Sequence, residues 1–411
     1  MKPRGLLRYA WPLLAAALLV GCPSGPTTGT LAVFVSGLPV GIDASIRIHG
    51  GTVDQTVTGT RTLQLAAGSY SVEVMPAFGN EAIARTVYDG ISASSSVSVA
   101  NGTTTDLEVD YERRPGTNRA WLGHSNGVRA FDAGEWSATG TVSPVTALAL
   151  PDGSATAQDI VIAPNGDLYA GTYSGSRLLR YAADVLDTAG AQPTGTVDVT
   201  GNPVGLVWHE GRLYVMTYVT QQILRFDTPQ AIVGTSVTSP DATISVTGFT
   251  GTGASAGLAF DSQGRLWAAF AGALVRIDDP TAPVGIVSVS ADAALTQSVT
   301  ENRLVLTYRD GSLFTAHCGA TAIQRYDAVD VASGVQAVPP TAVISVGLSC
   351  VTSIGFDASG RFWLSSSNSS AGRYADLGEV GDGSTVAPIV TIDHGTFIDG
   401  GSLTFNDIAG P

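Results

Sequence analysis

Hydrophobic and polar residues alternate with a period of two through much of the first hundred residues. The period appears in LAVFV (31–35), ASIRI (44–48), YSVEV (70–74), SVSV (96–99) and LEVDY (107–111). Gly, Pro and Asn separate these runs, which is typical of antiparallel strands with one buried face. Residues 30–112 are therefore expected to form a small β-sandwich, and ERRPGTN (112–118) indicates a linker at 113–118.

From residue 119 onward a different pattern recurs as a repeat. Each copy has an apolar strand, a tight turn with Gly, a strand carrying Tyr, Trp or Phe, and a third strand ending in Arg and a hydrophobic residue. A fourth strand follows, as in GTVDVTG and ATISVTG. Four strands in about 40 to 50 residues is the period of a β-propeller blade. The turn glycines lie 45 to 53 residues apart, at Gly166, Gly211, Gly264, Gly311 and Gly360.

Five complete copies leave one fragment at each end of the repeat region. RAWLGHSNGVRAFD (119–132) has the second and third strands of a blade without a first, and GSLTFNDIAG (401–410) matches the missing first strand. The two fragments together predict a sixth blade. The fold class expected for 119–411 is thus all-β, a six-bladed β-propeller closed by pairing the C-terminal strand with the first blade, which removes exposed sheet edges.

The N-terminus has the features of an export signal. Lys2, Arg4 and Arg8 precede an apolar stretch of roughly ten residues, too short for a bilayer that needs about 20. The stretch ends in LVGC, which resembles a bacterial lipobox. That resemblance implies a signal peptide at 1–21, lipidation of Cys22, a flexible tether at 22–29 and attachment to a membrane. Pro23 after the cysteine favours the outer membrane or cell surface over inner-membrane retention.

Two further resemblances concern the domains. SGLPVGIDASIRIHGG with LAAGSYSVEV is similar to the immunoglobulin-like or prealbumin-like modules of bacterial surface lipoproteins, which implies a spacer or binding module. GLAFDSQGRLWAA and IGFDASGRFWLSS resemble the NHL and gluconolactonase-like six-bladed propellers. This second resemblance indicates architecture only, because the same ring carries hydrolases, lyases and binding proteins.

Charge narrows the choice of partners. The chain is only 14 % charged, has a formal net charge of −14, and Lys2 is its only lysine. An acidic surface without basic clusters excludes nucleic acid as an expected partner and suits a soluble envelope protein. Calcium would be the one expected cofactor if any, although the sequence contains no D-x-D-x-D-G loop.

Cys318 and Cys350 remain once Cys22 is assigned to lipid. An even pair in an exported protein predicts a disulfide. Cys318 ends the second strand of one blade and Cys350 precedes the first strand of the next, so both lie on one face of the ring. No C-x-x-C spacing or neighbouring His supports a redox or metal role instead.

The same face of the ring is expected to carry any binding site. First positions of inner strands and last positions of second strands converge there, giving a mixed aromatic and polar rim suited to a small polar ligand or a peptide. The alternative is a water-filled channel. The candidate ligand-lining residues are Asp159, Arg303, His124, His317, Tyr173 and Tyr218.

Two other recurring residue types have a structural explanation beside a functional one. The acidic residues in FDSQG, FDASG and YRDG could together form a functional site, but Asp and Gly are common residues in turns. The arginine that recurs at one position of each blade could form an anion-binding ring, but packing between repeats explains the recurrence equally directly. These arginines are Arg180, Arg225, Arg276, Arg325 and Arg373.

The sequence carries no complete catalytic set. A gluconolactonase-like metal site needs Glu with Asn or Asp on inner strands, and Asp159, Asn202, Asn302 and Asn406 are the nearest candidates. G-x-S-x-G, H-E-x-x-H and Gly-rich phosphate loops are absent. The expected function is therefore a membrane-tethered binding or scaffolding protein of the cell envelope, with an envelope protein, a peptide or a small polar ligand as partner. A metal-dependent, lactonase-like hydrolase with a divergent site and a purely structural envelope role are the alternatives.

Overall fold

The computed structural model describes residues 27–151, 156–236, 239–250, 257–296, 304–317, 321–327, 334–378, 380–395 and 402–405. Within these ranges the chain is all-β, as the sequence predicted, and its helical elements are three short 3-10 helices. These are η1 (Ala133–Ser137), η2 (Ala183–Val185) and η3 (Pro229–Ala231). The chain divides into two compact units, which are described separately here.

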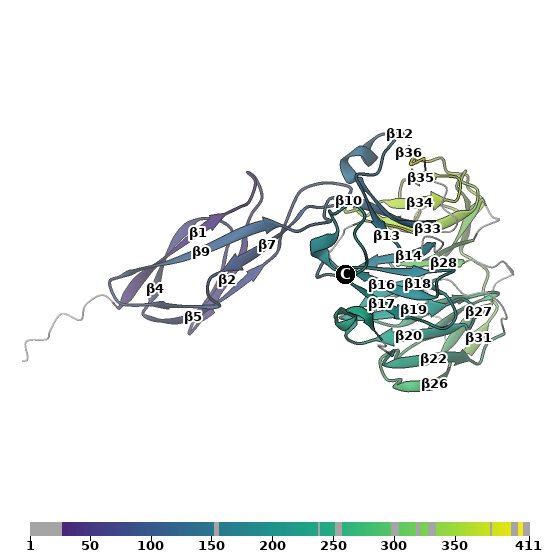
Figure 1. Ribbon diagram of the computed structural model, residues 1–411, viewed down its shortest axis with the longest axis horizontal. Coiled ribbons are helices and arrows are strands. Elements are labelled where there is room, and N and C mark those ends of the chain that lie inside the picture. Colours follow the sequence, from purple (N-terminus) through teal and green to yellow (C-terminus); the bar gives the residue numbers. More distant parts are fainter. Residues whose placement is uncertain are drawn as a thin grey trace, which may run out of the picture. The chain divides into compact units, whose positions relative to one another are not determined.

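The first unit comprises the described residues up to Pro76 together with Gly90–Tyr111. The strands of this region belong to two sheets, ordered β3-β2-β5-β8 and β4-β1-β9-β7-β6, of which β6 and the first residues of β7 fall in the segment 77–89 described below (Figure 1). Alternate side chains of β1, β4, β5 and β9 are buried, so the predicted period of two decides which face of each strand points inward. The strands are β1 (Thr28–Ser36), β2 (Ser45–Gly50), β3 (Val53–Val57), β4 (Arg61–Ala66), β5 (Gly68–Met75), β6 (Ala77–Phe78), β7 (Val87–Ser92), β8 (Ser96–Val99) and β9 (Thr104–Arg113).

The segment Ala77–Asp89 clusters with the second unit, although the sequence placed it inside the 30–112 domain. Ile83 and Ala84 are buried in an apolar cluster of the second unit. The Ala358 N–H donates to the carbonyl of Ile83 at 2.9 Å, and the Ser359 N–H donates to that of Ala82 at 3.1 Å. These two residues lie in a segment without a strand period, so the sequence gave no sign of their partners. We refer to residues 77–89 as the strap.

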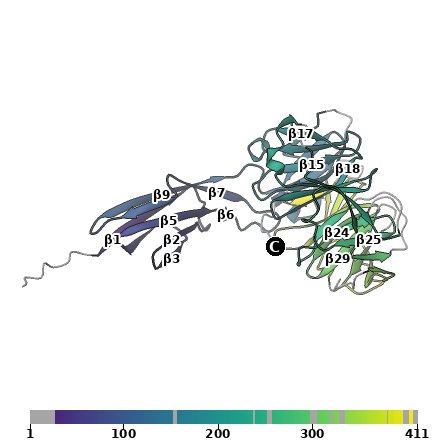
Figure 2. The same cartoon turned by 90° about the horizontal axis from the view of Figure 1, so that it is seen from below.

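The second unit consists of successive antiparallel sheets (Figure 2). Six such sheets are present among the described residues, each with four strands in antiparallel order. The first sheet contains β37 (Leu403–Phe405), β10 (Arg119–His124), β11 (Gly127–Asp132) and β13 (Thr146–Ala149), and the second contains β14 (Ala157–Ile162), β15 (Leu168–Thr172), β16 (Arg177–Tyr181) and β17 (Gly195–Asp198). The third contains β18 (Pro203–His209), β19 (Arg212–Thr217), β20 (Gln222–Phe226) and β22 (Ala242–Thr247), and the fourth contains β23 (Leu258–Phe260), β24 (Leu266–Phe270), β25 (Ala273–Ile277) and β27 (Ala293–Thr296). The fifth contains β28 (Leu304–Arg309), β29 (Ser312–His317), β30 (Ala322–Tyr326) and β32 (Ala342–Ser345), and the sixth contains β33 (Val351–Phe356), β34 (Phe362–Ser366), β35 (Ser370–Arg373) and β36 (Val390–Asp393).

The first strands of these sheets contact one another in sequence order. β14 contacts β18, β18 contacts β23, β23 contacts β28, β28 contacts β33, and β37 contacts both β33 and β14. β37 also pairs antiparallel with β10, with Leu403 opposite Leu122 and Phe405 opposite Ala120. Repeated four-stranded sheets whose first strands meet in this way form a β-propeller fold.

Short parallel strands join the outer edges of neighbouring sheets. Each lies between the third and fourth strands of one sheet and pairs with the fourth strand of the preceding sheet. Main-chain hydrogen bonds therefore connect neighbouring sheets, and the outer strands β36, β17, β22 and β27 gain a partner on their open side. These strands are β12 (Gly140–Thr141), β21 (Gly234–Ser236), β26 (Gly285–Ser290) and β31 (Gly334–Gln336).

Candidate functional site

A cavity of about 380 Å³ lies among the first strands of the second unit. Residues from all six sheets line it, because each first strand contributes side chains on the face that meets its neighbours. The lining is divided about equally between apolar and polar surface: Leu206, Leu258 and Leu306 are among its aliphatic residues, and threonine, serine and tyrosine hydroxyls are among its polar groups. A concave cavity with placed polar groups has the general character of a small-molecule site.

Asp159 is the one lining residue, among those described, whose side chain is an acid or base that titrates near neutral pH. Its carboxylate accepts hydrogen bonds from the Leu206 N–H at 2.6 Å and from the Ile160 N–H at 2.9 Å. The Ser402 hydroxyl bonds to it as well. Burial outweighs these bonds and raises the pKa of Asp159 to about 6. A β-bulge between Ala157 and Asp159 sets the direction of this side chain.

Asp159 also shares a structural task with two serines at equivalent positions of other sheets. The Ser402 hydroxyl accepts the Ile160 N–H at 2.8 Å, and the Ser353 hydroxyl accepts the Leu403 N–H at 3.0 Å. In each case the side chain accepts a backbone N–H from the first strand of the next sheet. The sequence register identified these positions, but this bond between sheets depends on their packing and carried no sequence signal.

Tyr173 and Tyr218 line the same cavity. Each follows the second strand of its sheet, and their rings meet edge to face with centroids 5.4 Å apart. The Tyr173 N–H donates to the Thr156 carbonyl and the Tyr218 N–H to the Asn202 carbonyl, which orders the backbone that carries them. The structure therefore brings Asp159, Tyr173 and Tyr218 together, as the predicted rim required.

The other predicted rim residues are placed differently. His124 is buried at the end of β10 and is not among the described residues that line the cavity. Burial lowers the pKa of His124, and the charge of Arg129 lowers it further. His317 ends β29 opposite Leu304 in the strand register. Arg303 lies outside the described residues, so its predicted position across the ring from Asp159 remains a prediction.

His394 is a buried titratable residue that the sequence analysis did not select. It follows β36, is 2 % exposed, and neither ring nitrogen has a hydrogen-bond partner among the described residues. Burial lowers its pKa to about 4, and the nearby His124 and Arg129 act in the same direction. A single His after a strand gives no sequence signal of such burial.

The residues considered for calcium do not assemble as a group in the described part of the chain. Asn202 has a positive φ of 60°, and its side-chain oxygen accepts the Ser176 hydroxyl at 2.5 Å. Asn302 and Asn406 lie outside the described residues. Among described side chains, no three His, Cys, Asp or Glu residues come together as a metal-binding group.

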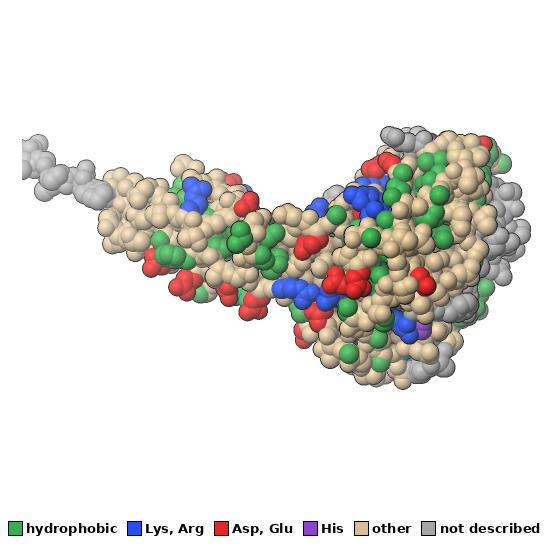
Figure 3. Space-filling view, turned by 90° about the horizontal axis from the view of Figure 1, so that it is seen from above, with side chains coloured by type: hydrophobic (Ala, Val, Ile, Leu, Met, Phe, Trp, Pro, Cys, Tyr) green, Lys and Arg blue, Asp and Glu red, His purple; other side chains and the backbone are tan. Residues whose placement is uncertain are grey.

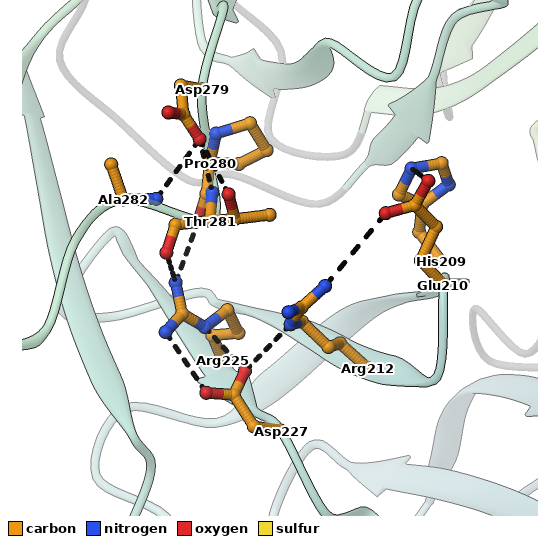
Figure 4. Close-up of polar contacts among 9 residues, drawn as sticks. All are labelled: His209, Glu210, Arg212, Arg225, Asp227, Asp279, Pro280, Thr281 and Ala282. Atoms are coloured by element: carbon orange, nitrogen blue, oxygen red, sulfur yellow. Dashed lines mark hydrogen bonds and ion pairs between the residues drawn. The ribbon is translucent and has the colours of Figure 1, made fainter.

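Three of the recurring arginines, Arg180, Arg225 and Arg325, donate to main-chain carbonyls of the following repeat, and Figure 4 shows these contacts for Arg225. Arg225 pairs with Asp227 and donates to the carbonyls of Pro280 and Thr281, which belong to the next sheet. Arg325 pairs with Asp327 in the same way and donates to carbonyls of residues 377, 378 and 380. Because carboxylates and carbonyls already surround these guanidinium groups, packing between repeats explains the recurrence.

The acidic turn residues likewise have structural partners. Asp261 accepts the N–H groups of Gln263 and Arg265 with one oxygen, and the indole N–H of Trp267 with the other. Asp357 makes the matching bonds, including one from the Trp363 indole at 3.1 Å. Each carboxylate thus closes its turn and orients the large aromatic residue of the second strand. This pairing of Asp with Trp gives the turn motif a packing role.

Cys350 lies immediately before β33 and has a positive φ of 50°. Its predicted partner, Cys318, lies outside the described residues, as do Cys22 and the predicted signal peptide. The disulfide and the lipid anchor therefore remain predictions. None of the helices in the described part of the chain has the length and apolar character needed to cross a bilayer. Acidic side chains are visible on both units in Figure 3.

No protein-family model and no curated protein sequence matches the chain. Among solved structures, it is similar to the WD40 domain of Toxoplasma gondii coronin. The two share 14 % sequence identity and superpose with a TM-score of 0.42, over 65 % of this chain and 68 % of the other.

Proposed function

We propose that this protein is an exported lipoprotein of the cell envelope whose propeller binds a small ligand in the central cavity. In this proposal Cys22 carries the lipid, residues 30–76 and 90–112 form a β-sandwich spacer, and the propeller has six blades. Pairing of β37 with β10, together with the contacts of β37 with β33 and β14, supports a closed ring. The repeats GLAFDSQGRLWAA and IGFDASGRFWLSS support an NHL or gluconolactonase-like kinship.

The observation that carries the binding function is the cavity itself. It combines aliphatic walls, two tyrosine rings and one hydrogen-bonded carboxylate in about 380 Å³. This volume lies at the lower end of the range of about 300–1,000 Å³ for small-molecule sites. A small organic molecule therefore fits the cavity better than a folded partner does.

Binding is tested by thermal unfolding of the full chain in detergent with a panel of small amphiphiles carrying six-carbon chains. A ligand in the cavity raises the unfolding midpoint in proportion to its occupancy. Leu258→Trp and Leu306→Trp fill the cavity and are expected to abolish the rise. Equal rises in the filled variants would place binding elsewhere and refute this function.

The lipid anchor and the hydrolase alternative have separate tests. Mass spectrometry of the N-terminal peptide is expected to show acylated Cys22, and Cys22→Ser is expected to release the protein from the membrane fraction. Unmodified Cys22 in a membrane-free protein would refute the anchor. A rise in unfolding midpoint with millimolar calcium that is lost in Asp159→Ala would favour the metal-dependent hydrolase.

A further inference from the structure

We infer that the cavity selects a small organic cation, a protonated or quaternary amine with an apolar body, and that Asp159 is its counter-ion. The inference rests on the proposed function, because it names the class of ligand for the same cavity. Its basis is the charge of the lining, the geometry of the carboxylate and the aromatic pair.

The first argument is charge. Asp159 accepts hydrogen bonds from three neutral donors, and none of the described residues that line the cavity is Lys, Arg or His. Burial disfavours the charged carboxylate, and a ligand cation that enters the cavity offsets part of that cost. An anionic ligand would instead face a like charge in a poorly solvated space. The net charge of −14 on the whole chain also attracts cations toward the protein.

The second argument is geometry. Three donors hold the carboxylate of Asp159 in place: the Leu206 N–H, the Ile160 N–H and the Ser402 hydroxyl. A carboxylate has about four acceptor positions, so one remains for a ligand N–H. The carboxylate is thus fixed before binding, which reduces the entropy lost when the ligand binds.

The third argument is the aromatic pair. Tyr173 and Tyr218 present their rings to the same cavity as Asp159. The face of an aromatic ring attracts a cation within about 6 Å, and desolvation strengthens the attraction. Leu206, Leu258 and Leu306 leave room beside these groups for an alkyl or aryl body. The carboxylate, the tyrosine rings and the leucines together match a cation that carries an apolar body.

The test compares four probes with the same six-carbon chain by isothermal titration calorimetry on the full chain at pH 7.5. Hexylamine and hexyltrimethylammonium are expected to bind at least about tenfold more tightly than hexanol, and hexanoate is expected not to bind. Asp159→Asn is expected to remove the preference for the amines. Asp106→Asn, an exposed aspartate of the first unit, makes the same change in net charge and is expected to leave the preference intact.

Two further measurements keep the inference testable if Asp159→Asn fails to fold. In the wild-type protein, amine affinity is expected to fall as the pH drops below about 6, where Asp159 becomes protonated. Tyr173→Leu with Tyr218→Leu is expected to weaken hexyltrimethylammonium more than hexanol. Equal affinity for hexylamine and hexanol in the wild type would refute the inference and leave the proposed binding function standing. Absence of binding by all four probes would contradict both.

Discussion

The carboxylate of Asp159 accepts the backbone N–H of Leu206 at 2.6 Å and so joins the first strands of two neighbouring sheets. The same group faces the central cavity. A residue that stabilises the contact between sheets thus also places a charge where a ligand would bind. This double role links the stability of the propeller to the chemistry of its cavity.

Asp159 is expected to make stability fall as the pH rises from about 4 to 6. Its pKa is raised to about 6 in the folded protein, above its unfolded value near 4, so the folded state binds more protons in this window. The effect is on the order of 3 kcal/mol. Urea unfolding measures the free energy of unfolding of wild type and Asp159→Asn between pH 4 and 6. The difference between the two proteins isolates the contribution of Asp159. A difference that does not change with pH would show that Asp159 is not perturbed.

His394 is expected to act in the opposite direction over an overlapping window. Its pKa is lowered to about 4, so below pH 6.5 the unfolded state binds the proton more readily than the folded state. Stability is fully present above pH 6.5 and is lost as the pH falls toward 4, by on the order of 3 kcal/mol. Comparison of wild type with His394→Leu by urea unfolding at pH 4.5 and 7.5 measures this loss. If wild type and His394→Leu differ in unfolding free energy by the same amount at pH 4.5 and 7.5, the prediction for His394 is wrong.

The strap is expected to stabilise the propeller through Ile83. This side chain is 5 % exposed and belongs to the apolar cluster that contains Trp363 and Phe405. Ile83→Ala is expected to cost about 2–5 kcal/mol in urea unfolding, because it leaves a cavity in that cluster. Ile91→Ala is the matched control, since Ile91 is 57 % exposed and its truncation is expected to change stability by less than about 0.5 kcal/mol. Similar costs for both variants would mean that the strap adds no stability.

Arg225→Lys tests whether the recurring arginines connect the sheets. Lysine keeps the charge but cannot contact Asp227 and two backbone carbonyls at once, so a loss of about 1–3 kcal/mol is expected. The control is Arg177→Lys, at a more exposed pair with Asp198, where less than about 1 kcal/mol is expected. An unchanged midpoint in Arg225→Lys would leave the recurrence of these arginines without a structural reason.

The predicted disulfide between Cys318 and Cys350 is tested by peptide mapping without reduction. A cross-linked peptide containing both cysteines is expected from protein prepared under oxidising conditions. Cys350→Ser is expected to lower stability by about 2–4 kcal/mol if the bond constrains the unfolded chain. Two free thiols in the oxidised protein would refute the pairing.

The all-β class and the boundaries of most repeats could be predicted because both depend on local periodicity. The turn glycines and the alternation in β1, β5 and β9 are signals within one strand or one turn. The sequence carried no sign that the strap clusters with the second unit, because its contacts with Ala358 and Ser359 join residues more than 270 positions apart in the chain. β12 was missed for a different reason, since its two residues carry no periodicity.

The candidate site shows the same division. The repeat register identified Asp159, Tyr173 and Tyr218, because equivalent positions of a repeated unit occupy equivalent places in the fold. It also suggested His124, which is buried near His394 and is not among the described residues that line the cavity. The direction of an end-of-strand side chain depends on local packing, which a register cannot specify.

By itself, the sequence determined the strand pattern, the repeat and the residues that recur at each position, since these follow from backbone periodicity and turn chemistry. Only the tertiary structure decided which groups lost their water. That loss raises the pKa of Asp159, lowers that of His394 and surrounds Arg225 with carbonyls of another sheet. Desolvation depends on neighbours brought together from distant parts of the chain, and a linear pattern does not contain them.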